Sequence, residues 1–180
     1  IQRSRGLGDV YKRQAREFGY GTKTGFDSFT EQPGTFREPS KWTLSSMHSV
    51  PIGYEISATP LQIAMSYAAI ANGGFLLKPY VVERIEKYDD TIIKNQRNTK
   101  KRILSQSNSE KLGLMLSHTV ENGSAKSAAI DGWNVAGKTG TSKKLIDGQY
   151  SEKEFISSFV GYFPYENPQL LCLIIIDSPD

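Results

Sequence analysis

The residues best suited to chemistry form a Lys-Thr-Gly-Thr tetrapeptide at positions 138–141. The ammonium of Lys138 can pair with a terminal carboxylate, and the hydroxyls of Thr139 and Thr141 can donate hydrogen bonds to it. Gly140 removes a side chain where a ligand must approach the backbone. The backbone N–H of Thr141 can serve as one donor of an oxyanion hole. These residues predict an extended strand that binds a peptide-like substrate through its main chain, with Lys138 and Thr141 supporting catalysis.

An alternative interpretation is a phosphate-binding loop, because residues 132–139 satisfy the Gly-x-x-x-x-Gly-Lys-Thr pattern. That loop requires a hydrophobic strand before it and a helix after it. Residues 127–131 make a poor strand, and residues 140–144 do not begin a convincing helix. The surroundings therefore disfavour nucleotide binding, although the pattern keeps it as an alternative.

A second Lys-Thr-Gly occurs at positions 23–25, so the tripeptide alone carries little information. Residues 15–55 are rich in Gly, Thr, Ser, Pro and aromatic residues and predict an ordered loop region with short elements. The basic segment 1–14 shows no useful periodicity. It resembles a cloning or assembly scar, so we predict a non-native origin for it. The domain proper is then expected over residues 15–180.

Strands are expected at 133–142, 156–163 and 170–176, with a turn at Asp147–Gly148 in the polar connection between the first two. The short link 164–168 predicts that the last two strands are antiparallel neighbours. The unbroken apolar run 170–176 predicts that both faces of the sheet are covered. Its single cysteine, Cys172, is expected to be a buried structural thiol.

Helices are expected at 59–72 and 108–121. Thr59 and Pro60 can begin the first helix, and the glycines after Asn72 can end it. Ser107 and Glu110 have capping-box spacing for the second. Its expected buried stripe is Leu112, Met115, Leu116, Thr119 and Val120. A polar hairpin with a turn at Asp89–Asp90 is expected over 80–94, and the whole pattern predicts an α+β fold with an antiparallel β-sheet flanked by helices.

The composition of the chain argues against some classes of function. The chain has 180 residues, 38% of them hydrophobic, and a formal charge of +3 with both signs interspersed. This charge is too small and too dispersed to predict a nucleic-acid partner. The longest apolar run, 170–176, is too short to span a bilayer.

Four segments resemble the class B penicillin-binding proteins, especially the septal transpeptidases that act in cell division. They are residues 18–27, residues 52–62 with 67–74, residues 120–125 with 135–141, and residues 158–164 leading into the last strand. The resemblance covers residues 15–180 and implies a penicillin-binding protein/serine β-lactamase-like fold. It also explains the first Lys-Thr-Gly as a structural segment.

The resemblance implies a serine-type D,D-transpeptidase that cross-links peptidoglycan stem peptides and is acylated by β-lactams. It assigns substrate binding to Lys138, Thr139, Gly140 and Thr141, and it implies no cofactor and no metal. It further implies membrane anchoring with the domain on the outer side of the bacterial cytoplasmic membrane, and partners among the division and wall-synthesis proteins. A D,D-carboxypeptidase, a β-lactam sensor and a non-catalytic scaffold of the same fold remain alternatives.

Two motifs of that family are missing. No serine of the chain has a lysine three residues on, and no Ser-x-Asn occurs. In the family both lie upstream of the Lys-Thr-Gly strand, so we interpret the chain as the C-terminal part of a transpeptidase domain. The chain alone is expected to fold poorly and to lack activity, because acyl transfer without the nucleophile loses most of its rate.

Overall fold

The computed structural model describes residues 2–26, 30–96 and 98–179, and the chain divides into two compact units. One unit contains residues 1–65 and 75–103, and the other contains residues 66–74 and 104–180. Each unit combines helices with antiparallel strands, which confirms the predicted α+β class.

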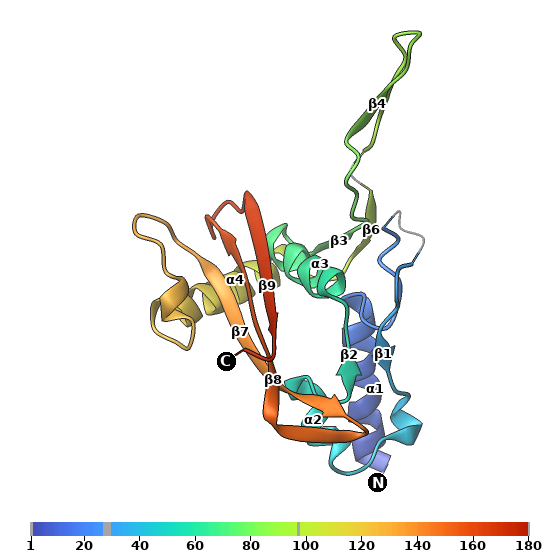
Figure 1. Ribbon diagram of the computed structural model, residues 1–180, viewed down its shortest axis with the longest axis vertical. Coiled ribbons are helices and arrows are strands. Elements are labelled where there is room, and N and C mark those ends of the chain that lie inside the picture. The colour runs from blue at the N-terminus through green and yellow to red at the C-terminus, as the bar shows by residue number, and fades with distance from the viewer. Residues whose placement is uncertain (1, 27–29, 97, 180) are drawn as a thin grey trace. The chain divides into compact units, whose positions relative to one another are not determined.

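The second unit is built on a three-stranded antiparallel sheet in the order β7-β8-β9 (Figure 1). Its strands are β7 (Ala136–Ile146), β8 (Gln149–Phe163) and β9 (Leu170–Asp177). Asp147 and Gly148 close the first hairpin with φ values of 50° and 80°, as a two-residue hairpin turn requires. The predicted turn and the predicted antiparallel pairing of the last two strands are both confirmed.

The hairpin of β7 and β8 is longer than the sequence pattern predicts. The strand expected from Trp133 begins at Ala136, and the strand expected from Ile156 begins at Gln149. Ion pairs across the two strands explain the extension: Lys143 Nζ lies 2.7 Å from Glu152, and Lys144 Nζ lies 3.3 Å from Glu154. Such cross-strand pairs stabilise a polar ribbon that has no hydrophobic alternation.

Strand β9 contradicts the expectation that both sheet faces are covered. Ile174 is 53% exposed, Ile176 is 52% exposed, and the thiol-bearing Cys172 is exposed rather than buried. In the described part of the chain β9 has only β8 beside it, and helix α4 (Gln106–Glu121) packs on β7 at the opposite edge of the sheet. An apolar strand therefore lies at an edge, with side chains accessible to solvent.

Helix α4 begins two residues earlier than expected, because Ser105 and not Ser107 caps it. The Ser105 hydroxyl accepts a hydrogen bond of 3.2 Å from the Asn108 N–H. The predicted buried stripe is correct only in part: Val120 is buried, Leu112, Leu116 and Thr119 are half-buried, and Met115 is 65% exposed. The buried residues of α4 are Ser109, Gly113, Ser117 and Val120.

A large buried ring explains why this face of α4 carries small residues. Tyr162 on β8 is only 1% exposed, and a Cβ at Gly113 would lie 3.1 Å from its hydroxyl. Burial raises the pKa of Tyr162 to about 12. Farther along the helix, Val120 joins Ala125 and Val135 in a core cluster against which Phe159 and Phe163 pack.

Helix α3 (Pro60–Ala71) forms as predicted and crosses the boundary between the units. Thr59 and Gln62 make a capping box, in which the Gln62 N–H donates to Thr59 Oγ1 (3.2 Å) and the Thr59 N–H donates to Gln62 Oε1 (2.9 Å). Gly73 and Gly74, with φ values of 85° and 99°, end the helix. The buried Gln62 also donates to the carbonyls of Thr22 (2.7 Å) and Pro33 (2.8 Å).

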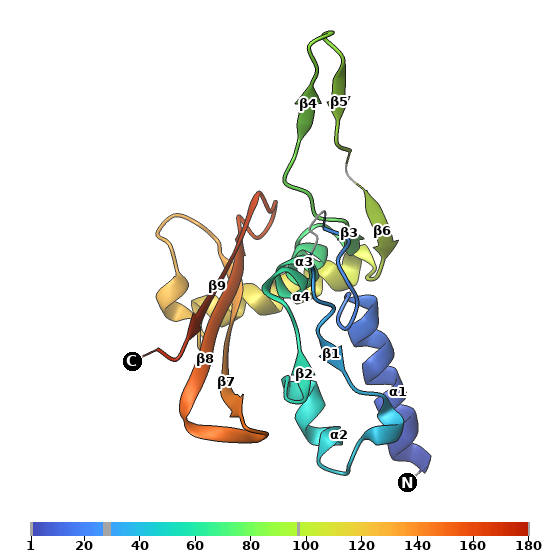
Figure 2. The same ribbon diagram turned by 45° about the vertical axis from the view of Figure 1, so that its right-hand side comes forward.

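The first unit consists of short elements, as expected for residues 15–55, together with a polar hairpin. Its strands β4 and β5 run beside each other as a narrow ribbon beyond β3 and β6 (Figure 2). Asp90 adopts a φ of 59° in the predicted turn. The elements are β1 (Thr35–Phe36), η1 (Pro39–Lys41), α2 (Ser46–Ser49), η2 (Val50–Ile52), β2 (Ile56–Ser57), β3 (Phe75–Leu77), β4 (Arg84–Glu86), β5 (Ile92–Lys94) and β6 (Thr99–Arg102).

The first unit also contains a helix that the sequence pattern did not predict, α1 (Gln2–Glu17). A Cβ at Gly8 would lie 3.2 Å from the Trp42 ring, and Lys12 forms an ion pair with Glu38. Residues 8–17 therefore pack on this unit, while the non-native origin of residues 1–14 stays a prediction.

Candidate active-site strand

The predicted site residues all lie on strand β7, at the edge of the three-stranded sheet. Register with β8 pairs Lys138 with Val160, Thr139 with Phe159, Gly140 with Ser158 and Thr141 with Ser157. Side chains alternate along a strand, so Lys138 and Gly140 share one face while Thr139 and Thr141 share the other. Lys138 and Thr141 are exposed, and Thr139 and Gly140 are half-buried.

Two contacts indicate which backbone groups point out of the sheet. The Ser158 hydroxyl on β8 donates to the carbonyl of Gly140 (3.3 Å), so this carbonyl points toward β8. Backbone groups of the neighbouring residues in a strand then point the opposite way, which directs the N–H and C=O of Thr139 and Thr141 toward the outer edge. The Lys138 ammonium accordingly reaches the Thr139 carbonyl at 2.9 Å.

The outer edge of β7 can therefore receive an extended ligand. No other strand pairs with β7 on that side within the residues that the structure describes. The edge offers the Thr141 N–H as a hydrogen-bond donor, with the Lys138 cation beside it. This combination suits an anionic, peptide-like ligand, because strand addition supplies main-chain bonds and the ammonium supplies charge.

Close packing against β8 explains two glycines of this strand. A Cβ at Gly137 would lie 2.6 Å from Cζ of Phe159 and 2.9 Å from the Val160 carbonyl oxygen. A Cβ at Gly140 would lie 2.7 Å from the Ser158 hydroxyl. Gly137 thus lets the Phe159 ring lie across the strand and join the core cluster, which anchors β7.

The sequence pattern does not predict one contact of the site. Ser124, in the loop after α4, lies with its Oγ 3.0 Å from Oγ1 of Thr139. The sequence signal was present, since residues 120–125 belong to the segments that carry the family resemblance, but nothing in their pattern indicates contact with the strand.

The structure argues against the phosphate-binding loop. Lys138 and Thr139, which would begin the helix of such a loop, instead lie inside β7. The residues before it form an isolated bridge between Ile130 and Trp133 rather than a buried strand. The alternative of nucleotide binding through this pattern is therefore wrong.

The other Lys-Thr-Gly, at 23–25, binds a carboxylate of the chain itself. The Thr24 N–H and hydroxyl both donate to Glu31 Oε1 at 2.5 Å, and the Gly25 N–H donates to Glu31 Oε2 at 3.1 Å. Partial burial acts to raise the pKa of Glu31, but the bonds from Thr24 and Gly25, with Lys100 nearby, outweigh it and lower this pKa. The expected structural role of this tripeptide agrees with these contacts.

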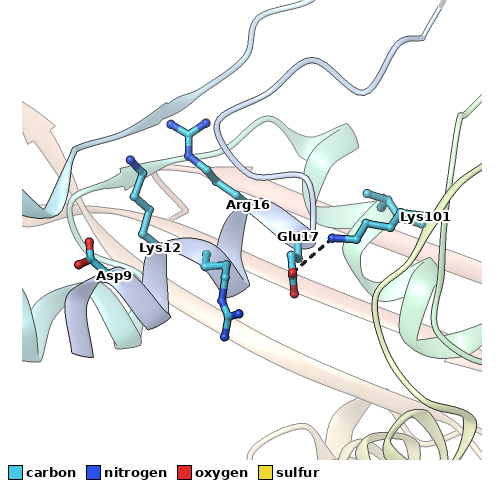
Figure 3. Close-up of a pocket in the computed structure, with 7 residues that line it drawn as sticks. Asp9, Lys12, Arg16, Glu17 and Lys101 are labelled. Carbon is cyan, nitrogen blue, oxygen red and sulfur yellow. Dashed lines mark hydrogen bonds and ion pairs between the residues drawn. The ribbon is translucent and has the colours of Figure 1, made fainter. Parts of the chain in front are cut away.

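A shallow and mostly basic hollow of the first unit does not involve β7. It is lined by α1 residues, including Asp9, Lys12 and Arg16, and by Leu76 and Lys101; Figure 3 shows Lys101 paired with Glu17.

Among the described residues, no group of three or more His, Cys, Asp or Glu side chains could hold a metal ion. None of the helices described has the length and apolar character needed to cross a bilayer.

Comparison with known proteins identifies the family. The model of the penicillin binding protein transpeptidase domain matches residues 8–180. Stage V sporulation protein D of Bacillus subtilis is 32% identical over 166 residues, which are 91% of this chain and 26% of that protein. The peptidoglycan D,D-transpeptidase FtsI homolog of Mesostigma viride is 34% identical over 141 residues, which are 71% of this chain and 24% of that protein.

A solved structure has the same fold. Penicillin-binding protein 3 of Mycobacterium tuberculosis, complexed with ampicillin, superposes with a TM-score of 0.90 at 28% identity, covering 95% of this chain and 40% of that one. The chain thus spans about a quarter of the length of the curated relatives and less than half of the solved neighbour. With a family model that matches nearly its whole length, the chain belongs to the penicillin-binding protein transpeptidase domain family.

Proposed function

We propose that the chain is the C-terminal part of a peptidoglycan D,D-transpeptidase domain and supplies its substrate-binding strand. In the complete enzyme an upstream serine attacks the carbonyl of the penultimate D-alanine of a stem peptide and the terminal D-alanine leaves. The acyl group then passes from the serine to an amine of a neighbouring stem, which forms the cross-link. A β-lactam reacts with the same serine when its ring opens.

In this proposal each residue of the tetrapeptide has one role. Lys138 provides positive charge beside the reacting centre, and the hydroxyls of Thr139 and Thr141 bind the carboxylate of the donor or drug. Gly140 lets the donor lie against the backbone, and the Thr141 N–H stabilises the oxyanion. The observation that carries the proposal is the accessible outer edge of β7, with the Thr141 N–H directed away from β8 and the Lys138 ammonium beside it.

The names of the relatives favour transpeptidation over the alternative functions of the same fold. One matching relative is named a peptidoglycan D,D-transpeptidase, and another is named for sporulation. We propose a role in septal wall synthesis, with the parent anchored in the cytoplasmic membrane and this domain outside it. The proposed ligands are stem peptides and β-lactams, and the proposed partners are division and wall-synthesis proteins.

The experiment is covalent labelling with a fluorescent penicillin, applied both to the complete domain and to the 180 residues alone. We expect the complete domain to be labelled and the isolated chain to remain unlabelled. Addition of a donor and an amine acceptor should then yield a cross-linked product, whereas a carboxypeptidase would give only the hydrolysed donor. Labelling of the pure isolated chain, or a complete domain that resists labelling, would contradict the proposal.

A further inference from the structure

Ser124 occupies a position that three features of the chain hold in place. Helix α4 ends at Glu121, and the N–H groups of Gly123 and Ala125 both donate to the Thr119 carbonyl at 3.1 Å. A Cβ at Gly123 would lie 2.8 Å from that same carbonyl oxygen, so only glycine fits this turn without movement. Ala125 is buried in the core cluster. Ser124 thus lies between the tight backbone turn at Gly123 and the buried Ala125.

The loop brings the Ser124 hydroxyl to the Thr139 hydroxyl, at an oxygen–oxygen distance of 3.0 Å, and no other side chain that the structure describes bonds to this hydroxyl. Ser124 is exposed and Thr139 is half-buried, so the pair is accessible to a ligand. Thr141, on the same face of β7, has no side-chain hydrogen bond to any residue that the structure describes. The two hydroxyls therefore differ: Thr139 has a side-chain partner, and Thr141 has none among the described residues.

Each hydroxyl has one proton and can also accept, so the Ser124–Thr139 bond has two possible directions. If Thr139 donates to Ser124, its proton is used and its oxygen would face an incoming carboxylate. If Ser124 donates to Thr139, the Thr139 proton is free to bind an anion. A negatively charged ligand selects the second direction, and the resulting chain of hydroxyls polarises itself toward the anion.

We propose that Ser124 is a positioning residue that directs the Thr139 hydroxyl proton toward the carboxylate of the donor peptide or drug. This inference rests on the proposed function and deepens it. Ser124 acts through Thr139 and touches no reacting atom. Its effect is therefore on binding of the carboxylate and not on the rate of the acylation step.

The test uses the complete transpeptidase domain and two thioester donors, one with a free terminal carboxylate and one in which this carboxylate is amidated. Rapid-mixing kinetics separate the dissociation constant of the donor from the acylation rate constant. For the carboxylate donor, Ser124→Ala should raise the dissociation constant about tenfold, in line with the loss of one hydrogen bond. The acylation rate constant should stay within about twofold, because the oxyanion donors are unchanged.

Four comparisons sharpen this test. Ser124→Thr keeps a hydroxyl and should restore binding. Ser124→Asp can only accept from Thr139 and repels the anion, so it should weaken binding more than alanine does. Ser127→Ala removes an exposed serine of the short 3-10 helix η3 (Lys126–Ala128) that follows Ser124 and should change neither constant. In the Thr139→Val background, Ser124→Ala should have no further effect.

The outcomes separate the two proposals. If wild-type enzyme is not acylated at all, the proposed function fails and this inference fails with it. If wild type is acylated but Ser124→Ala binds the carboxylate donor equally well, or weakens both donors alike, only the role of Ser124 is refuted. A loss confined to the carboxylate donor and restored by Ser124→Thr supports it.

Discussion

The chain contains the same tripeptide twice, and the two copies occupy different environments. Lys23-Thr24-Gly25 lies in a loop, with Thr24 only 8% exposed and Gly25 at a φ of 81°. Lys138-Thr139-Gly140 lies in an edge strand with ordinary extended backbone and an exposed lysine. The loop copy binds the Glu31 carboxylate of its own chain, whereas the strand copy leaves its outer backbone edge open.

The difference shows what the tripeptide can do and what its surroundings add. In the loop, one threonine hydroxyl and two N–H groups, with Lys100 nearby, hold a carboxylate and lower its pKa. This is an internal example of the carboxylate binding that we propose for Thr139 and Thr141. Only the strand copy adds an accessible main-chain edge, which is what a peptide ligand needs in order to bind as an additional strand.

The largest expected effect separates the two lysines. In the complete domain, Lys138→Ala should lower the second-order rate of acylation by a fluorescent penicillin about 100-fold, because it removes a charge close to an anionic ligand. Lys23→Ala is the matched control and should change this rate less than about twofold, as expected for an exposed residue outside the site. Equal effects of the two variants would remove the functional distinction between the copies.

The threonines should show opposite patterns of stability and activity. Thr24→Val breaks a partly buried hydrogen bond to a charged group and should lower the free energy of unfolding by about 1–2 kcal/mol, with acylation unchanged. Thr139→Val should lower it by less than about 0.5 kcal/mol but weaken binding of a carboxylate ligand. Urea unfolding and acylation kinetics on the same samples measure both. A Thr139 variant that is the less stable of the two would assign that residue a structural role instead.

Gly25 and Gly140 are required for different reasons, and substitution of each by alanine should reveal the difference. Gly25→Ala places a side chain at a φ of 81° and should cost about 1 kcal/mol of stability, although the nearest atom would be 3.4 Å away. Gly140 needs no special φ, but its Cβ would meet the Ser158 hydroxyl at 2.7 Å.

Gly140→Ala should therefore be tolerated better once Ser158 is also changed to alanine. The double variant should regain stability in urea unfolding but still acylate about tenfold more slowly, because the methyl group displaces the ligand from the strand. If the double variant acylates like wild type, ligands do not approach the backbone at Gly140.

Much of the fold could be predicted from the sequence, where local signals are strong. The capping residues of α3, the turn at Asp147–Gly148 and the antiparallel pairing of β8 with β9 all follow from short-range rules. The errors concern tertiary context. No helical period reveals that Tyr162 needs small residues opposite it on α4, and no strand pattern reveals that Cys172 lies on an edge strand.

The candidate site also has one part that the sequence predicts and one part that depends on tertiary context. The residue types and spacing of Lys138–Thr141 indicate a binding strand, and the structure does place them on an edge strand. The contact between Ser124 and Thr139 joins residues from a helix-ending loop and a strand, so only the folded arrangement reveals it. The role of each residue in substrate binding stays a prediction that the variants above test.

The smallest expected effect is a pH dependence that belongs to the loop copy alone. The pKa of Glu31 is lowered in the folded chain relative to its ordinary value of 4.5, so the bound carboxylate stabilises the fold above that value. This stabilisation should be lost as the pH falls through the lowered pKa, because the protonated carboxyl accepts the Thr24 and Gly25 bonds less well. The difference in unfolding free energy between wild type and Glu31→Gln should accordingly shrink from pH 7 to pH 3. Thr24→Val should reduce this change, whereas Thr139→Val should leave it intact, and a difference that grows in acid would mean that Glu31 is not held as a carboxylate.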